Sequence, residues 1–75
     1  MKIDKIFGKV LKESRSKHNI SQYDLANLAE LDRTYISLLE RGLRQPTIST
    51  LFKLAKALNI KPSSIITKVE EIYEN

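Results

Sequence analysis

The sequence predicts an all-α fold of five helices joined by short connections. Five segments repeat apolar residues at the spacing of an α-helix, and no segment alternates apolar and polar residues as a strand would. Residue types that begin or end helices separate these segments. A chain of 75 residues makes one small domain, which we assign to residues 1–75.

The first predicted helix covers residues 3–17. Asn19 follows it, a residue type that tolerates the left-handed conformation found after helix ends. Gly8 weakens this helix by about 1 kcal/mol relative to alanine. The apolar positions at helical spacing are Ile3, Ile6, Phe7, Val10 and Leu11.

Residues 21–42 predict two short helices separated by a tight turn at residues 30–31. Ser21 and Asp32 each stand where a capping side chain precedes a helix, and Gly42 ends the second helix because it accepts a positive φ. The expected core positions are Leu25, Leu28, Ala29, Ile36 and Leu39. Two short helices in this arrangement predict a helix-turn-helix unit that reads DNA.

The fourth predicted helix covers residues 48–58. Pro46 prevents the preceding helix from continuing, Thr47 caps the new helix, and Asn59 ends it. One face carries the apolar residues Ile48, Leu51, Leu54, Ala55 and Leu58.

The fifth predicted helix covers residues 62–73, with Pro62 in its first turn. Its apolar residues fall on two sides: Ile65, Val69 and Ile72 on one, Ile66 and Tyr73 on the other. One side is enough to cover a small core, so this helix predicts a two-fold homodimer interface formed by these five residues. Ordinary core packing by all five is the alternative. A two-fold dimer places two reading helices about 34 Å apart, one turn of DNA.

The formal net charge is +4 and the pI is about 9.5. Residues 1–44 hold nine Lys or Arg against six Asp or Glu, so most of the excess lies in the half that contains the helix-turn-helix unit. A basic excess of this kind favours a polyanionic partner such as double-stranded DNA. Solubility alone is the alternative explanation.

The outward face of the third helix contains the residues that can read bases. An arginine donates two hydrogen bonds to guanine, which is worth about 1–3 kcal/mol of discrimination, and a leucine can pack on thymine methyl groups. We predict base reading by Arg33, Thr34, Ser37 and Leu38, and phosphate contacts by Gln22, Arg41, Arg44 and Gln45. A merely solvated helix face is the alternative for both sets.

Catalysis is not expected. The chain has no cysteine, which excludes disulfides and thiolate metal sites. His18 has no cluster of carboxylates near it in sequence, and no nucleophile–base pair or glycine-rich phosphate loop is visible. Apolar runs fall short of the roughly 18 residues of a membrane span, and the N-terminus lacks a signal-peptide core. We expect a cytoplasmic, nucleoid-associated protein that is not an enzyme and needs no metal or cofactor.

The pattern S-Q-x-x-L-A-x-x-A-x-L-x-x-x-x-I-S-x-x-E-R-G, followed by P-T-I-S-T-L-x-K-L-A-K-A-L, resembles the Cro/CI-type (XRE-like) repressor domain over residues 5–66. The resemblance implies a compact lambda-repressor-like fold whose third helix enters the major groove. It also implies an ion pair between Arg15 and Glu40, and a Gln22 that meets the phosphate backbone or bridges to the reading helix. Leu38 departs from the pattern, which often has a polar or basic residue there, and Lys61 replaces the usual Ser or Thr cap before Pro62.

The phrase DRTYIS followed by ER further resembles the controller proteins of restriction–modification systems, which are small homodimeric regulators. This implies a sequence-specific transcriptional regulator that binds an inverted-repeat operator and controls a restriction–modification operon by blocking or recruiting RNA polymerase. The alternative is an antitoxin or prophage-repressor module that acts partly through a protein partner.

Overall fold

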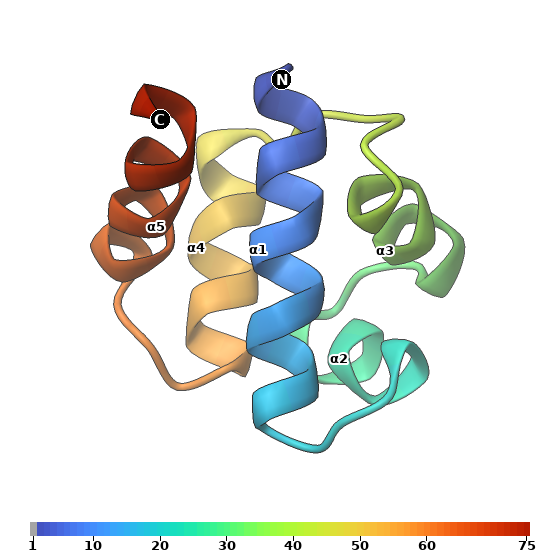
Figure 1. Cartoon of the computed structure of the whole chain (residues 1–75). Coiled ribbons are helices and arrows are strands. Elements are labelled where there is room, and N and C mark those ends of the chain that lie inside the picture. Colours follow the sequence, from blue (N-terminus) through green and yellow to red (C-terminus); the bar gives the residue numbers. More distant parts are fainter. Residues whose placement is uncertain (1) are drawn as a thin grey trace.

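The computed structural model describes residues 2–75. Within this range it contains five α-helices and no strand: α1 (Ile3–Lys17), α2 (Gln22–Ala29), α3 (Arg33–Glu40), α4 (Ile48–Ala57) and α5 (Pro62–Glu74) (Figure 1). The predicted all-α architecture of five helices is therefore confirmed. Across residues 2–75, no helix has both the length and the apolar character that crossing a membrane requires.

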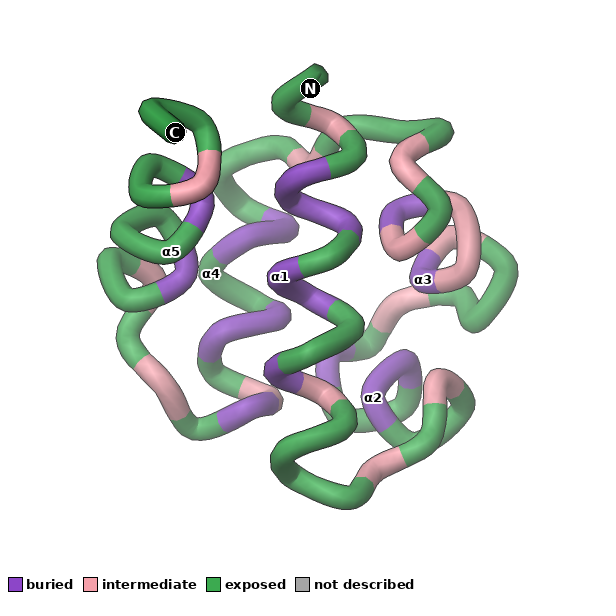
Figure 2. The backbone as a smooth tube through the Cα atoms, viewed as in Figure 1, coloured by how far each residue is buried: buried purple, intermediate pink, exposed green. Residues whose placement is uncertain are grey.

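Helix α1 is the central element. It contacts α3 on one side and α5 on the other, while α2 contacts α3 and α4, and α4 contacts α5. Figure 1 shows α1 in front, with α4 between it and α5 in this view. Figure 2 shows that the buried residues lie where the helices face one another. The helix-turn-helix pair α2–α3 thus rests on a platform made by α1 and α4.

The core combines residues from all five helices. Most of the apolar positions expected to be buried are buried, and Gly8, Ser14, Ala26 and Thr50 join them. The apolar core consists of Ile6, Phe7, Val10, Leu11, Leu25, Ala26, Ala29, Ile36, Leu39, Leu51, Leu54, Ala55, Leu58, Ile65 and Val69.

Two of the three predicted side-chain caps form. The Asp24 N–H donates to Ser21 Oγ at 3.0 Å, and the Thr50 N–H donates to Thr47 Oγ1 at 3.1 Å. Each bond satisfies one of the free N–H groups at a helix start. Asp32 occupies the N-cap position of α3, but its side chain makes no capping hydrogen bond, so that prediction was wrong in its chemistry.

The three residues expected to take a positive φ after a helix all do so. Asn19 and Asn59 have φ angles of 56° and Gly42 has a φ of 74°. Beyond Gly42, the Leu43 N–H donates to the Leu38 carbonyl oxygen at 2.9 Å, which closes the end of α3 in the manner of a Schellman motif.

Ile3, Leu28 and Ile48 were expected on the apolar faces of their helices, but all three are exposed. Leu28 is 60% exposed, because α2 turns Leu25, Ala26 and Ala29 inward and leaves Leu28 at the edge of that stripe. Ile48 is 72% exposed, because it is the first residue of α4 and lies beyond the end of the core.

Candidate nucleic-acid interface

The turn between α2 and α3 contains no glycine. Glu30 adopts the left-handed conformation instead, with a φ of 57°. This conformation is uncommon for a residue with a Cβ. The Leu31 N–H donates to the Ala26 carbonyl oxygen at 2.8 Å, and Leu31 packs partly buried against the core. The turn lies at residues 30–31 as predicted, but nothing in the sequence distinguished Glu30 as its left-handed residue.

Helix α3 buries the side chains on one face and leaves those on the opposite face accessible to solvent. Ile36 and Leu39 are completely buried, so their predicted core positions are confirmed. Arg33 and Thr34 are exposed in the first turn. Ser37 and Leu38 are half-buried, so they can meet only a partner that approaches α3 closely.

Glu40 holds the end of α3 against α1 and α2. Arg15 donates two hydrogen bonds to it, from Nε to Oε2 at 2.6 Å and from Nη2 to Oε1 at 3.0 Å. The side chains of Arg15 and Glu40 are 14% and 3% exposed. The hydrogen bond to Glu40 raises the pKa of Arg15, desolvation lowers it, and the negative charge of Glu40 raises it further. The implied ion pair is therefore present.

Gln22 bridges to α3 from the first turn of α2. Its Nε2 donates to Glu40 Oε1 at 3.0 Å. Of the two roles considered for Gln22, the structure contains the bridge to the reading helix. An amide nitrogen carries two hydrogens, so the second donor remains free for a phosphate.

The loop between α3 and α4 carries the other predicted phosphate contacts. Arg41 and Arg44 are both exposed, and Arg44 Nη1 donates to the Leu43 carbonyl oxygen at 2.9 Å. Gln45 is tied to α1, because its Nε2 donates to Asp4 Oδ1 at 2.7 Å. One N–H of Gln45 therefore anchors the loop, which leaves one for a phosphate.

Gly8 has a role that sequence reasoning missed. A Cβ at this position would lie 2.5 Å from the Leu39 carbonyl oxygen and 2.6 Å from that of Glu40. The missing side chain thus lets the backbone of α3 rest directly on α1. Gly42 makes a similar contact, since a Cβ there would lie 2.9 Å from Lys5 Cα. The only signal in the sequence was an isolated glycine inside a helical pattern.

The predicted dimer residues of α5 divide into two groups. Ile65 and Val69 are only 1% and 6% exposed, because they fill the core beneath α5. They cannot form an interface between folded copies, so that part of the prediction is corrected. Ile72 is half-buried, whereas Ile66 and Tyr73 are exposed.

A second pair of apolar side chains lies on α4. Ile48 and Phe52 occupy the flank of α4 opposite to Lys53 and Ala57, which line a hollow against α2. On α5, Ile66 and Tyr73 are exposed, and Ile66 lines a hollow together with Phe7 of α1 and Pro46. Helices α4 and α5 contact each other. We call the surface formed by Ile48, Phe52, Ile66 and Tyr73 the α4–α5 face.

Comparison with known proteins gives consistent results. The helix-turn-helix family matches residues 11–65. Control protein C.SmaI of Serratia marcescens is 41% identical over 68 residues, which cover 91% of this chain and 81% of that protein.

Two solved structures extend the similarity to the fold. The restriction–modification controller protein C.AhdI from Aeromonas hydrophila superposes with a TM-score of 0.80 at 41% identity, covering 81% of this chain and 92% of that chain. Controller protein C.Esp1396I, solved as a tetramer in complex with its natural 35-base-pair operator, superposes with a TM-score of 0.85 at 31% identity, covering 95% and 93% of the two chains.

Proposed function

Because this chain belongs to the helix-turn-helix family and, within it, to the controller proteins of restriction–modification systems, we propose that it is a sequence-specific transcriptional regulator of such an operon. The observation that carries the proposal is the geometry of α3. One side of this helix is fixed against α1 by Glu40 and Gly8, and the other presents Arg33 and Thr34 to solvent. A rigidly held helix with free polar donors is what reading a base sequence requires.

The proposed mechanism divides the residues of the unit into two groups. Base contacts specify sequence, and we assign them to Arg33, Thr34, Ser37 and Leu38. Phosphate contacts position the protein, and we assign them to Gln22, Arg41, Arg44 and Gln45. Gln22 connects the groups, because it hydrogen-bonds to Glu40. A phosphate on its free N–H would therefore hold both α2 and α3 in place on the duplex.

We further propose that the chain acts as a homodimer through the α4–α5 face. Large apolar side chains gathered on one surface are characteristic of protein interfaces, and Ile48, Phe52, Ile66 and Tyr73 are each about half exposed or more. This face lies on the flank of α4 turned away from α2, so pairing there leaves the helix-turn-helix unit free. A two-fold pair then matches an inverted-repeat operator.

The dimer would regulate transcription from the operator, in the cytoplasm beside the nucleoid, by blocking or recruiting RNA polymerase. Protein concentration would control this regulation, because dimer formation makes operator occupancy rise steeply with the concentration of the protein.

The test is a fluorescence-anisotropy titration of a labelled duplex taken from upstream of the chain's own gene. We expect this duplex to bind at least a hundredfold more tightly than a scrambled duplex of equal composition. The logarithm of the binding constant should fall linearly with the logarithm of salt concentration, because bound phosphates release counterions. Equal affinity for both duplexes would overturn sequence-specific reading, and affinity independent of salt would overturn the phosphate contacts.

A further inference from the structure

The loop between α3 and α4 lies against the first turn of α1. At the start of the loop, a Cβ on Gly42 would lie 2.9 Å from Lys5 Cα. Near the end of the loop, Gln45 Nε2 donates to Asp4 Oδ1 at 2.7 Å. Two consecutive residues of α1 thus contact the loop before and after Arg44, which is exposed. The path of the loop therefore depends on α1 as well as on the two helices that it connects.

The carboxylate of Asp4 is well placed to hold the loop. Asp4 is half-buried, and together with Gln45 it lines a hollow of about 150 Å³. The other side chains around this hollow are apolar: Ile3, Phe7, Pro46 and Ile66. Apolar neighbours reduce the water that competes for a hydrogen bond. A bond to a charged acceptor is also stronger than one between neutral groups.

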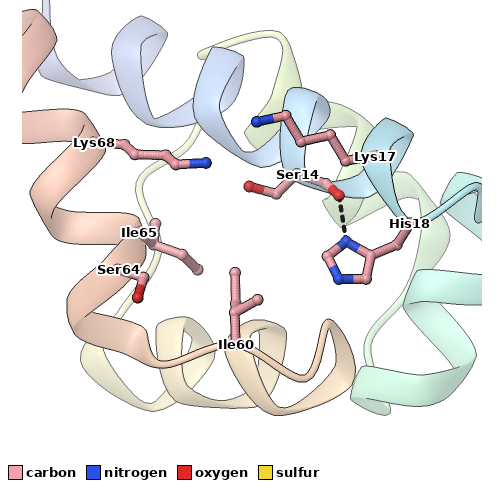
Figure 3. A pocket seen from close by; sticks show the side chains of 7 residues that line it. All are labelled: Ser14, Lys17, His18, Ile60, Ser64, Ile65 and Lys68. Carbon is pink, nitrogen blue, oxygen red and sulfur yellow. Dashed lines mark hydrogen bonds between the residues drawn. The ribbon is translucent and has the colours of Figure 1, made fainter.

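The side chain at the opposite end of α1 bonds within its own helix. Figure 3 shows the ring of His18, whose Nδ1 donates to the Ser14 carbonyl oxygen at 2.8 Å. The hollow beside this ring is lined by residues of α1, of α5 and of the connection before α5. None of these residues is assigned to DNA contacts. Asp4, in contrast, bonds to a residue 41 positions away in the loop that is assigned to phosphates.

The charge of Asp4 and its hydrogen bond have opposite consequences for DNA binding. A phosphate on the free N–H of Gln45 would lie close to the Asp4 carboxylate, and like charges repel. By charge alone, removal of this carboxylate should strengthen DNA binding. If the carboxylate fixes the loop, its removal should weaken DNA binding. Asparagine separates the two effects, because it lacks the charge but keeps an oxygen acceptor.

We propose that Asp4 is a positioning residue for DNA binding. It holds the Gln45 amide, and it thereby fixes the loop that presents Arg41, Arg44 and Gln45 to the phosphate backbone. This inference rests on the proposed function, because it takes the loop as a DNA contact. It adds a residue of α1 that acts on DNA only through another side chain.

The test compares Asp4→Asn with Asp4→Ala, two uncharged variants that differ in whether the side chain can accept the bond. We expect Asp4→Ala to bind the operator duplex about fivefold more weakly than Asp4→Asn, the effect of one hydrogen bond. The ratio should be the same for a scrambled duplex, because phosphate contacts carry no sequence information. Both variants lose the same charge near the start of α1, so neither repulsion nor the helix dipole explains the difference.

Glu13→Gln and Glu13→Ala form the matched control pair. Glu13 is an exposed carboxylate of the same helix, and it lines a hollow with Lys68 and Ile72 of α5. These two variants should bind the operator duplex with equal affinity. In a Gln45→Ala background, the difference between the two Asp4 variants should disappear, because the donor of the bond is absent.

A measurement without DNA makes the outcome independent of the operator. The NMR order parameters of the backbone amides of residues 43–45 should fall from about 0.85 toward about 0.6 in Asp4→Ala and stay high in Asp4→Asn. Equal order parameters in the two variants, or equal affinities for DNA, would overturn the positioning role. A wild-type protein that did not discriminate operator from scrambled duplex would overturn the proposed function instead. The order parameters would then still decide whether Asp4 holds the loop.

Discussion

Glu40 links three helices through one carboxylate. It ends α3, and it accepts hydrogen bonds from Arg15 on α1 and from Gln22 on α2. Arg15 also donates to the Ile20 carbonyl oxygen at 2.9 Å, which fixes the connection that leads into α2. A nearly buried charge is tolerated here because each carboxylate oxygen has a partner. This carboxylate therefore sets where the reading helix lies.

We expect Glu40→Ala to lower the free energy of unfolding by about 3 kcal/mol, because it leaves the Arg15 guanidinium without its partner. Urea denaturation measures the change. Glu74→Ala, at the exposed end of α5, is the control and should have almost no effect. A Glu40→Ala variant with the stability of wild type but no DNA binding would contradict the structural assignment.

Variants of Arg33 and Arg41 test the proposed division between base reading and phosphate binding. We expect Arg33→Ala to fold normally and to reduce discrimination between operator and scrambled duplex by about 1–3 kcal/mol, because an arginine that contacts guanine specifies that base. Arg41→Ala should lower the binding affinity for both duplexes by the same factor. Competition titrations with the two duplexes measure both effects. Unchanged discrimination in Arg33→Ala would remove Arg33 from the base-reading set.

At the level of elements, α3 is positioned by contact between backbones. The carbonyl groups of Leu39 and Glu40 lie so close to Gly8 that no Cβ fits between them. Helix propensity alone favours alanine over glycine by about 1 kcal/mol. The close approach of α1 and α3 outweighs this preference for alanine, because backbone atoms cannot move aside as a flexible side chain can.

We therefore expect Gly8→Ala to destabilise the fold by about 2 kcal/mol or more and to weaken operator binding, since α3 must shift. Ser16→Ala, on the exposed side of the same helix, should be neutral or slightly stabilising. Thermal unfolding of both variants checks the comparison. A Gly8→Ala variant that melts above wild type would show that the two helices separate without cost.

The helices also show how much of the fold the sequence could predict. Helix positions followed from apolar spacing and from caps such as Ser21 and Thr47, because these are local properties of the chain. The roles of Gly8, Leu28 and Ile48 were not local. Each depends on which neighbouring helix lies nearby and at what distance, and a single sequence without its tertiary contacts does not contain that information.

The reading face was predictable in part for the same reason. A helical wheel placed Ile36 and Leu39 inward, which left Arg33 and Thr34 outward. It could not show that Gln22 reaches Glu40 or that Gln45 reaches Asp4. Those contacts join residues 18 and 41 positions apart, so only the packed structure reveals them.

At the scale of the whole molecule, the residues of the α4–α5 face come from α4 and α5, whereas α2 and α3 form the helix-turn-helix unit. Phe52 is 57% exposed and Leu28 is 60% exposed, but only Phe52 lies on the α4–α5 face. This pair therefore separates the effect of one specific surface from the effect of removing any exposed apolar side chain.

We expect Phe52→Glu to convert the dimer to a monomer at micromolar concentration, because two copies of a charge would be buried at the two-fold interface. Leu28→Glu should remain dimeric. Sedimentation velocity measures the two states, and circular dichroism confirms that both variants fold. If Phe52→Glu sedimented as wild type, the interface would lie elsewhere.

The backbone contact at Gly8 also has a consequence for how such regulators diversify. The groups that fix α3 on α1 are backbone carbonyls, which every amino acid possesses, together with the Glu40 carboxylate and the buried side chains of Ile36 and Leu39. The side chains that face outward carry none of this attachment. Under the base contacts proposed for Arg33, Thr34 and Ser37, new target sequences would be acquired by exchanging these residues while the scaffold is inherited unchanged, so that specificity would evolve separately from stability.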